Sequence, residues 1–271
     1  EQNTVIYTFT SKGGGVKFAE MQGEKKVFED EFVKINERSK SAVGSLAKSY
    51  KDIETTNYKV IKQGENFVVY EGQLEEGVTV TKTWTVENGT GEKAHNLKLT
   101  INFVVAEGKS IQLGNYSVTT GTSTPLFLEE QRDRSGWFVF EDGDYDHDMQ
   151  GEFTGGMFSD EKSVVTKKVE NLEFIGVDNQ FFTTTIFPAS DAKGDNIWVT
   201  GSEFDIEDGK RWQFLMGTEL PNNTLVGGQQ DNFSFDVFMG AKDRKVLRSL
   251  TSNSETIINY GWWTWAGTSE F

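Results

Sequence analysis

Strict alternation of apolar and polar residues is the feature of this sequence that most limits its fold. Between residues 78 and 86, apolar side chains fall on every second position and threonines lie between them. The apolar positions are Val78, Val80, Trp84 and Val86, and the polar ones are Thr79, Thr81, Thr83 and Thr85. A half-buried β-strand has this period of two, because successive side chains point to opposite faces. Lys82 is the one residue that breaks the apolar face.

A second alternating run follows after a turn. Residues 88–91 read Asn-Gly-Thr-Gly, which is typical of a hairpin turn, and every second residue from Leu97 to Val105 is apolar. We therefore expect residues 78–86 and 97–105 to pair as antiparallel neighbours. Similar runs, separated by clusters of Gly, Asn and Asp, lie at residues 5–9, 66–70, 137–140, 180–187, 196–200, 211–216 and 232–239.

These runs continue along the whole chain without a shift in composition. The 28 glycines against 3 prolines, together with 21 Phe, favour sheets joined by glycine turns. The Gly-Gly-Gly run at residues 13–15 lacks the Lys-Ser/Thr that follows in a phosphate-binding loop, so we interpret it as a tight turn after the first strand. We predict one all-β domain over residues 1–271, built as a large antiparallel β-sandwich.

Two short helices are expected within this β-rich chain. The segment Ser39–Tyr50 places Val43, Leu46, Ala47 and Tyr50 at helical spacing. The segment Ala241–Leu250 places apolar residues on one side and basic residues on the other. Residues 241–271 are accordingly predicted to form a helical C-terminal segment.

Charge and composition exclude several function classes. The formal net charge is −15, and this field repels phosphate backbones, so nucleic acid is not an expected partner. With no Cys, the chain cannot hold a disulfide, a thiolate zinc site or an iron–sulfur cluster. We expect no cofactor. No apolar stretch reaches the roughly 18 residues of a membrane span, and the chain begins with Glu1, so we interpret it as an excised soluble piece.

An acidic run offers a weak candidate for a metal site. Asp142, Asp144, Asp146 and Asp148 alternate in sequence, and closely spaced carboxylates can bind calcium. The run lacks the glycine and the terminal glutamate that an EF-hand loop requires. A solvated acidic loop is the preferred interpretation, since charge runs usually face water.

The C-terminal end combines aromatic and basic residues. Tyr260, Trp262, Trp263 and Trp265 lie close together, and upstream of them are Lys242, Arg244, Lys245 and Arg248. Trp and Tyr rings settle at the headgroup level of bilayers, and basic residues add attraction to anionic lipid. These eight residues are our candidates for a membrane-proximal site. Packing of the rings onto the sandwich, with the cations merely solvating a helix terminus, is an equally supported alternative.

Two blocks in the C-terminal third resemble a known family. Residues 172–182 followed by 186–188 read LEFIGVDNQFF and IFP, and they are similar to the "W-x-G-x-x-x-x-Y-F … I-P" stretch in the periplasmic domain of bacterial YidC membrane-protein insertases. Residues 237–243, then Leu247 and 259–262, resemble that domain's "G-P-K … L … D-Y-G-W" ending. Near the start, residues 11–16 resemble the family's Gly-Gly turn after its opening strand. The chain departs from the family pattern at Phe174, Phe181, Ala241 and Asn259, where the family has Trp, Tyr, Pro and Asp.

The resemblance implies a β-supersandwich related in fold to galactose mutarotases, with a few short helices mostly near the C-terminus. It implies a location on the periplasmic side of the bacterial inner membrane, within an integral membrane protein. The implied role is accessory, with the Sec translocon's auxiliary subunits and nascent membrane proteins as partners. The family's insertion groove lies among transmembrane helices that this chain lacks, so no catalytic residues are expected.

Two other functions stay open from the residues alone. A mutarotase-like carbohydrate-active enzyme needs a carboxylate base and a histidine acid, and only His95 and His147 could supply the latter. A carbohydrate-binding module would use exposed aromatic rings as platforms for sugars, and the seven Trp permit it.

Overall fold

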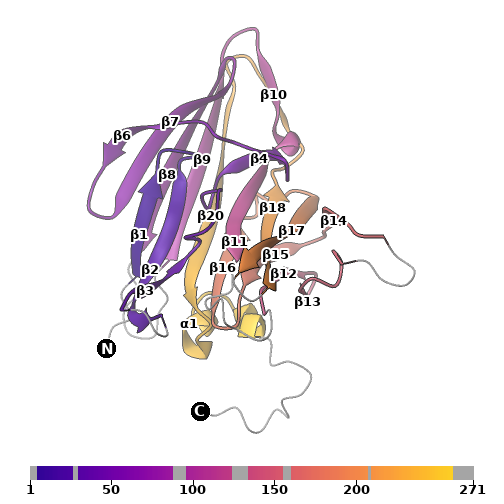
Figure 1. Ribbon diagram of the computed structural model, residues 1–271. Coiled ribbons are helices and arrows are strands. Elements are labelled where there is room, and N and C mark those ends of the chain that lie inside the picture. The colour runs from indigo at the N-terminus through magenta and orange to yellow at the C-terminus, as the bar shows by residue number, and fades with distance from the viewer. Residues whose placement is uncertain are drawn as a thin grey trace.

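The computed structural model describes residues 5–26, 30–87, 96–123, 134–154, 160–206 and 209–258. Strands dominate this part of the chain, and every pairing between its named strands is antiparallel (Figure 1). The described helices are short: η1 (Leu113–Asn115), α1 (Arg244–Arg248) and η2 (Ser254–Ile258). The predicted antiparallel, mainly all-β fold is therefore confirmed.

The largest sheet has nine strands. In spatial order they are β13 (Asp144–Asp148), β12 (Gly136–Glu141), β15 (Leu172–Asp178), β16 (Phe182–Pro188), β20 (Gln230–Ala241), β9 (Asn96–Val105), β8 (Val78–Glu87), β7 (Phe67–Glu75) and β6 (Lys59–Gln63).

Three smaller sheets accompany it. The six-stranded sheet has the order β14 (Val165–Lys168), β17 (Asn196–Ile206), β18 (Gly209–Glu219), β11 (Ser117–Ser123), β4 (Leu46–Ser49) and β5 (Asp52–Ile53). The three-stranded sheet consists of β1 (Val5–Thr10), β2 (Gly15–Lys25) and β3 (Phe32–Ile35). The two-stranded sheet joins β10 (Ser110–Gln112) to β19 (Thr224–Val226).

The two alternating runs of the sequence form β8 and β9, which pair with each other. The two strands pair over their full length, with Trp84 opposite Leu99. Val78, Val80 and Trp84 are fully buried, whereas the threonines between them are half-buried. The predicted antiparallel pair is confirmed, and its expected turn, residues 88–91, lies outside the described residues.

The smaller sheets cover the nine-stranded sheet. Strands β11 and β18 pack on β12, β15 and β16, while β2 and β3 pack on β20 and β16. The main hydrophobic core contains side chains from all four sheets, including Ile35, Phe103, Phe214 and Leu225. On β18, Phe214 and Met216 face this core, which leaves Leu215 on the outer face of the six-stranded sheet.

The predicted helix at Ser39–Tyr50 is wrong. The segment holds an isolated bridge between Val43 and Val16, and then strand β4. Gly44 adopts φ +81°, a left-handed conformation that interrupts a right-handed helix. The helical spacing of the apolar residues arose by chance, because Val43 and Leu46 are buried in the main core from extended backbone.

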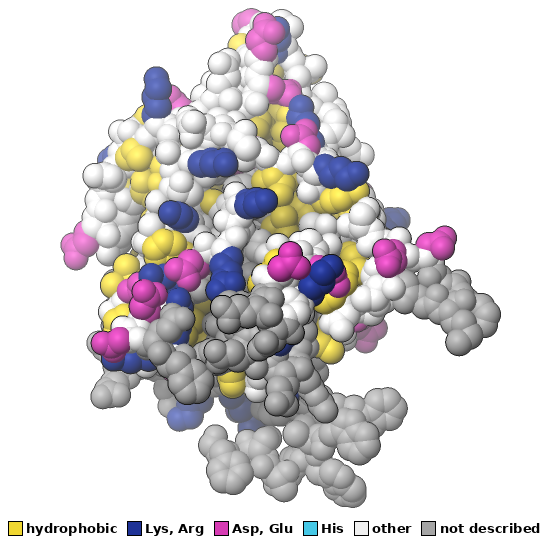
Figure 2. All heavy atoms as spheres, in the orientation of Figure 1, with side chains coloured by type: hydrophobic (Ala, Val, Ile, Leu, Met, Phe, Trp, Pro, Cys, Tyr) yellow, Lys and Arg dark blue, Asp and Glu magenta, His cyan; other side chains and the backbone are white. Residues whose placement is uncertain are grey.

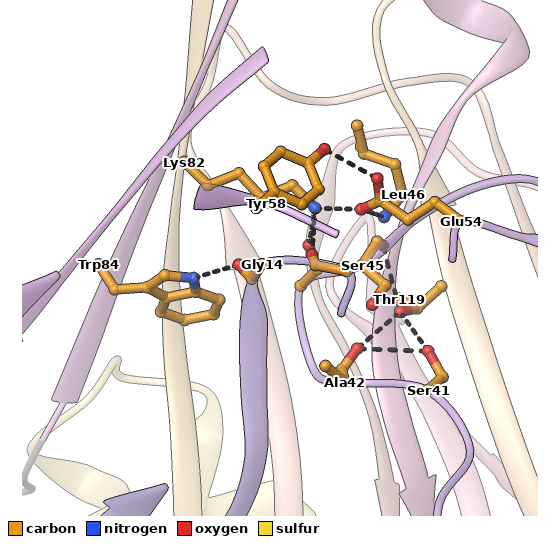
Figure 3. Close-up of polar contacts among 12 residues, drawn as sticks. Gly14, Ser41, Ala42, Ser45, Leu46, Glu54, Tyr58, Lys82, Trp84 and Thr119 are labelled. Atoms are coloured by element: carbon orange, nitrogen blue, oxygen red, sulfur yellow. Dashed lines mark hydrogen bonds and ion pairs between the residues drawn. The ribbon is translucent and has the colours of Figure 1, made fainter. Parts of the chain in front are cut away.

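The glycine turn after β1 was predicted correctly and has a second role. Gly13 and Gly14 have φ of +75° and +57°. Their carbonyl oxygens accept hydrogen bonds from buried side chains of β8: Lys82 Nζ at 2.7 Å and Trp84 Nε1 at 2.9 Å (Figure 3). The turn is therefore fixed to the nine-stranded sheet.

Lys82, the residue that breaks the apolar face, is completely buried. Its ammonium group forms an ion pair with Glu54, donates a hydrogen bond to the carbonyl oxygen of Gly44 at 3.0 Å, and lies 4.9 Å from the ring centre of Tyr58 (Figure 3). Burial lowers the pKa of Lys82, and the Glu54 carboxylate opposes that shift. A buried charge needs such partners, so this cluster fixes the glycine turn, β4 and β8 together.

Candidate functional site

A short helix follows the last strand at one end of the sandwich (Figure 1). Strand β20 ends at Ala241, and Asp243 caps α1 by accepting hydrogen bonds from the backbone N–H groups of Lys245 and Val246 at 2.8 and 3.0 Å. Aspartate at this position satisfies donors that a helix start leaves unpaired. The predicted helix is thus present, in a shorter form than the sequence indicated.

A second hydrophobic core holds this segment against the outer face of the nine-stranded sheet. Its buried members are Phe138, Phe140, Phe174, Phe238, Leu247 and Ile257. The rings of Phe140 and Phe174 stack with centroids 5.1 Å apart. Because Leu247 of α1 and Ile257 of η2 are both fully buried, the chain is fixed to the sandwich as far as η2.

Lys242, one of the four predicted basic candidates, is tied to a buried carboxylate. Its Nζ lies 2.9 Å from Asp178 Oδ2, and His147 Nε2 lies 3.1 Å from Asp178 Oδ1. The side chain of Asp178 is 1% exposed and that of Lys242 is 10% exposed. The charge of Lys242 is therefore used inside the fold, and it offers little attraction to an external anion.

The other basic candidates lie on α1 and are exposed. Arg244 and Arg248 both form ion pairs with Glu255 of η2, and Arg248 Nη2 donates to Glu255 Oε1 at 3.1 Å. These arginines hold the pKa of Glu255 below its usual value through their hydrogen bonds. Lys245 is likewise exposed on α1.

The aromatic candidates Tyr260, Trp262, Trp263 and Trp265 lie outside the described residues. The described chain ends with η2 at this end of the sandwich. The structure therefore places the basic half of the predicted site, and the aromatic half stays a prediction.

One exposed aromatic residue was missed in the sequence. Phe181 lies between β15 and β16 and is 46% exposed. Its carbonyl oxygen accepts a hydrogen bond from the backbone N–H of Lys242 at 2.8 Å, so it is adjacent to the start of α1. The signal was available, since in the Phe181–Phe182 pair an extended backbone sends the two rings to opposite sides.

The acidic run is a β-hairpin arm. Asp142 lies in the turn with φ +50°, and Asp144, Asp146 and Asp148 lie on β13. Asp142 accepts from Asn171, Asp146 pairs with Lys167 at 3.2 Å, and Asp148 accepts from the backbone of Met149. No group of three or more His, Asp or Glu in the described part of the chain is arranged to hold a metal ion.

The histidines and exposed Trp rings that the two carbohydrate functions require are not gathered at one site in the described part of the chain. His147 is bound to Asp178, and two hollows of about 410 and 470 Å³ on the outer face of the six-stranded sheet are lined without it. His95 lies outside the described residues. None of the Trp residues within the described ranges is exposed: these are Trp84, Trp137, Trp198 and Trp212.

Tyr145 is buried next to negative charges at this end of the nine-stranded sheet. Burial raises the pKa of Tyr145, and the negative charges of Asp178 and Asp146 raise it further. The tyrosine therefore stays neutral, and its ring packs beside Phe138 with centroids 5.8 Å apart.

Within the described residues, no helix has the length and apolar character needed to cross a bilayer.

Comparisons with solved structures give distant likenesses. A galactose mutarotase-like protein from Lactobacillus casei shares 12% sequence identity with a TM-score of 0.46, over 89% of this chain and 98% of that one. The galactosidase domain of the alpha-galactosidase-sucrose kinase AgaSK shares 8% identity with a TM-score of 0.39, over 74% of this chain and 30% of that one. A search of curated proteins found no match.

A family model gives the assignment. The model described as the YidC periplasmic domain matches residues 16–268, which include the named strands from β2 onward, apart from the first residue of β2, and the helices α1 and η2. The described parts of the two motif blocks fall on β15, β16 and the end of β20 with α1, which contribute to the second core and hold the Asp178–Lys242 pair, whereas residues 259–262 lie outside the described residues. The chain belongs to the YidC periplasmic domain family.

Proposed function

We propose that this chain is the non-catalytic periplasmic domain of a YidC-type membrane-protein insertase, acting on the periplasmic side of the bacterial inner membrane. The family match over residues 16–268 is the observation that carries the proposal. In this role the domain assists the insertion and folding of inner-membrane proteins, and the chemistry of insertion belongs to the membrane-embedded part of the protein.

The second part of the proposal concerns the membrane surface. The exposed ring of Phe181 and the exposed Lys245 lie at the end where α1 is fixed, directly upstream of the tryptophan-rich residues 260–265. Aromatic rings and cations together favour the interface of an anionic bilayer. We therefore assign this end as the membrane-facing one.

Replacing Trp262, Trp263 and Trp265 together by Ser is expected to reduce binding to vesicles that contain anionic phospholipid at least about tenfold, because each ring loses its burial in the headgroup layer. Phe181→Ser should weaken binding by a smaller factor. Flotation of the domain with the vesicles measures both effects.

Val226→Ser is the matched control, because Val226 is 49% exposed and lies on β19, whose partner β10 is at the end of the molecule away from α1 (Figure 1). This variant should float like the parent. Equal flotation of the tryptophan variant and the parent would remove the membrane-surface part of the proposal.

The partners follow from the family assignment. We propose contacts with the Sec translocon's auxiliary subunits and with nascent membrane proteins. In the full-length protein, deleting residues 16–268 should abolish co-purification of those subunits; unchanged co-purification would refute this contact.

A further inference from the structure

A cationic hollow lies on the outer face of the six-stranded sheet. It has a volume of about 470 Å³, which is within the range of small-ligand sites. Its rim carries four exposed cations, which are Lys12, Arg38, Lys40 and Lys51. They come from three separate parts of the sequence, so the fold and not a local charge run brings them together.

None of these four cations has an ion pair with a carboxylate in the described part of the chain. The neighbouring acid Glu37 is directed to Lys26 and Lys34, at 3.5 and 3.7 Å. In a chain whose net charge is −15, four cations around one hollow are a local excess of positive charge.

The one carboxylate that lines the hollow is already used. Glu54 forms the buried ion pair with Lys82, and its two oxygens also accept from the Leu46 backbone N–H at 2.7 Å and the Tyr58 hydroxyl at 2.8 Å (Figure 3). Its side chain is only 5% exposed. The negative charge of Glu54 is therefore compensated from inside, and the rim cations are left for an external anion.

The floor of the hollow contributes hydroxyl and amide groups and no aromatic ring. It is formed by strands β11, β17 and β18, which contribute Thr122, Thr200, Ser202 and Gln213. Two of these groups also bond within the protein, since the Thr200 hydroxyl donates to the Ser163 carbonyl at 2.9 Å and the Gln213 amide donates to Ser202 Oγ at 3.0 Å. Figure 2 shows Lys and Arg side chains spread across the middle of the visible face, where Figure 1 places β4 and β11. Hydroxyls, an amide and cations around one hollow suit a ligand rich in oxygen and negative charge.

We propose that this hollow binds a polyvalent oxyanion, with phosphate groups as the recognised chemistry. Because the floor is the face of a sheet and not its edge, the site offers side chains and no row of unpaired backbone groups. The source of the phosphate is either a free anion or the headgroup of a phospholipid.

Inorganic tripolyphosphate is the direct probe, measured by titration calorimetry at low salt, where charge–charge attraction is least screened. The parent domain should bind it, and added salt should weaken binding. The triple variant R38E/K40E/K51E should bind at least about tenfold more weakly, which requires a loss of only ~1.4 kcal/mol.

The matched control reverses three exposed charges away from the hollow, at Lys62, Lys98 and Lys168. K62E/K98E/K168E changes the net charge by the same amount and should lose less than about threefold in affinity, since only long-range charge is altered. Thermal unfolding checks that each variant is folded, and R38Q/K40Q serves as a milder variant if the triple one is not.

Two results would overturn the proposal: no binding of tripolyphosphate by the parent, or equal losses in the two triple variants. Flotation with vesicles of phosphatidylglycerol and phosphatidylcholine separates the sources. Loss of flotation in R38E/K40E/K51E supports a lipid headgroup in the hollow, and unchanged flotation with loss of tripolyphosphate binding supports a free anion.

Discussion

Glu54→Ala is expected to lower the free energy of unfolding by about 3–5 kcal/mol, because it leaves the ammonium group of Lys82 buried without its counter-charge. Lys82 is fully buried, and the carbonyls of Gly13 and Gly44 alone cannot replace a carboxylate. Tyr58 and the backbone N–H of Leu46 lose an acceptor as well. Denaturant unfolding, followed by Trp fluorescence, measures the change.

The pH dependence of this variant has a defined sign. Burial lowers the pKa of Lys82 and Glu54 opposes the shift, so removing Glu54 lowers that pKa further. The unfolded chain then binds more protons than the folded one between the lowered pKa and about 10.4, and stability rises with pH across this window. The difference in free energy of unfolding between the parent and the Glu54→Ala variant should therefore become smaller at alkaline pH.

Two controls accompany this prediction. Glu152→Ala breaks an exposed pair with Lys162, whose side chains are 43% and 51% exposed, and should change stability by no more than about 0.5 kcal/mol. The double variant K82M/E54L should be less destabilised than the sum of its single variants, since neither charge is then buried alone. A loss of under about 1 kcal/mol for Glu54→Ala would show that the ion pair is not a main stabilising contact.

Gly44→Ala is expected to destabilise the fold by about 2–5 kcal/mol, from two additive causes. Gly44 has φ +81°, a backbone conformation that costs free energy for L-amino acids but not for glycine. A Cβ there would lie 2.4 Å from Cζ2 of the buried Trp84 and 3.0 Å from Leu99 Cδ2, so the core would have to shift. Thermal unfolding by calorimetry measures the loss.

Gly108→Ala separates the two causes. Gly108 has φ +75°, and a Cβ there would meet nothing within 4 Å. Only the backbone cost of about 1–2 kcal/mol applies to it. Equal effects of the two substitutions would contradict the tight packing of Gly44 against Trp84.

Periodicity predicted the strands because burial on one face is a local property of the sequence. The alternation from Val78 to Val86 and from Leu97 to Val105 determined both the strands and their pairing. The helix predicted at Ser39–Tyr50 was wrong because the spacing of apolar residues alone does not distinguish a helix from a buried extended segment. Gly44 at the centre of that pattern was the available warning, since glycine weakens a helix interior by about 1 kcal/mol.

Pairs of residues that lie far apart along the chain could not be predicted from the sequence. Lys82 was visible as a break in the pattern, but its partner Glu54 lies 28 residues away in sequence. Lys242 was assigned to a membrane-proximal surface, whereas the structure pairs it with buried Asp178, 64 residues away. Such pairs depend on how the sheets stack, which a single sequence does not encode locally. The cationic hollow was missed for the same reason.

Labelling of a single cysteine in the full-length protein tests whether this domain lies on the periplasmic side of the inner membrane. The described chain contains no Cys, so Lys62→Cys at an exposed position of β6 gives one reporter in this domain. The full-length parent, with any cysteines elsewhere replaced, is the control. A membrane-impermeant maleimide should label the variant in intact spheroplasts as fully as after lysis, because the domain lies on the periplasmic side. Labelling that requires lysis would show that the domain does not lie on the periplasmic side.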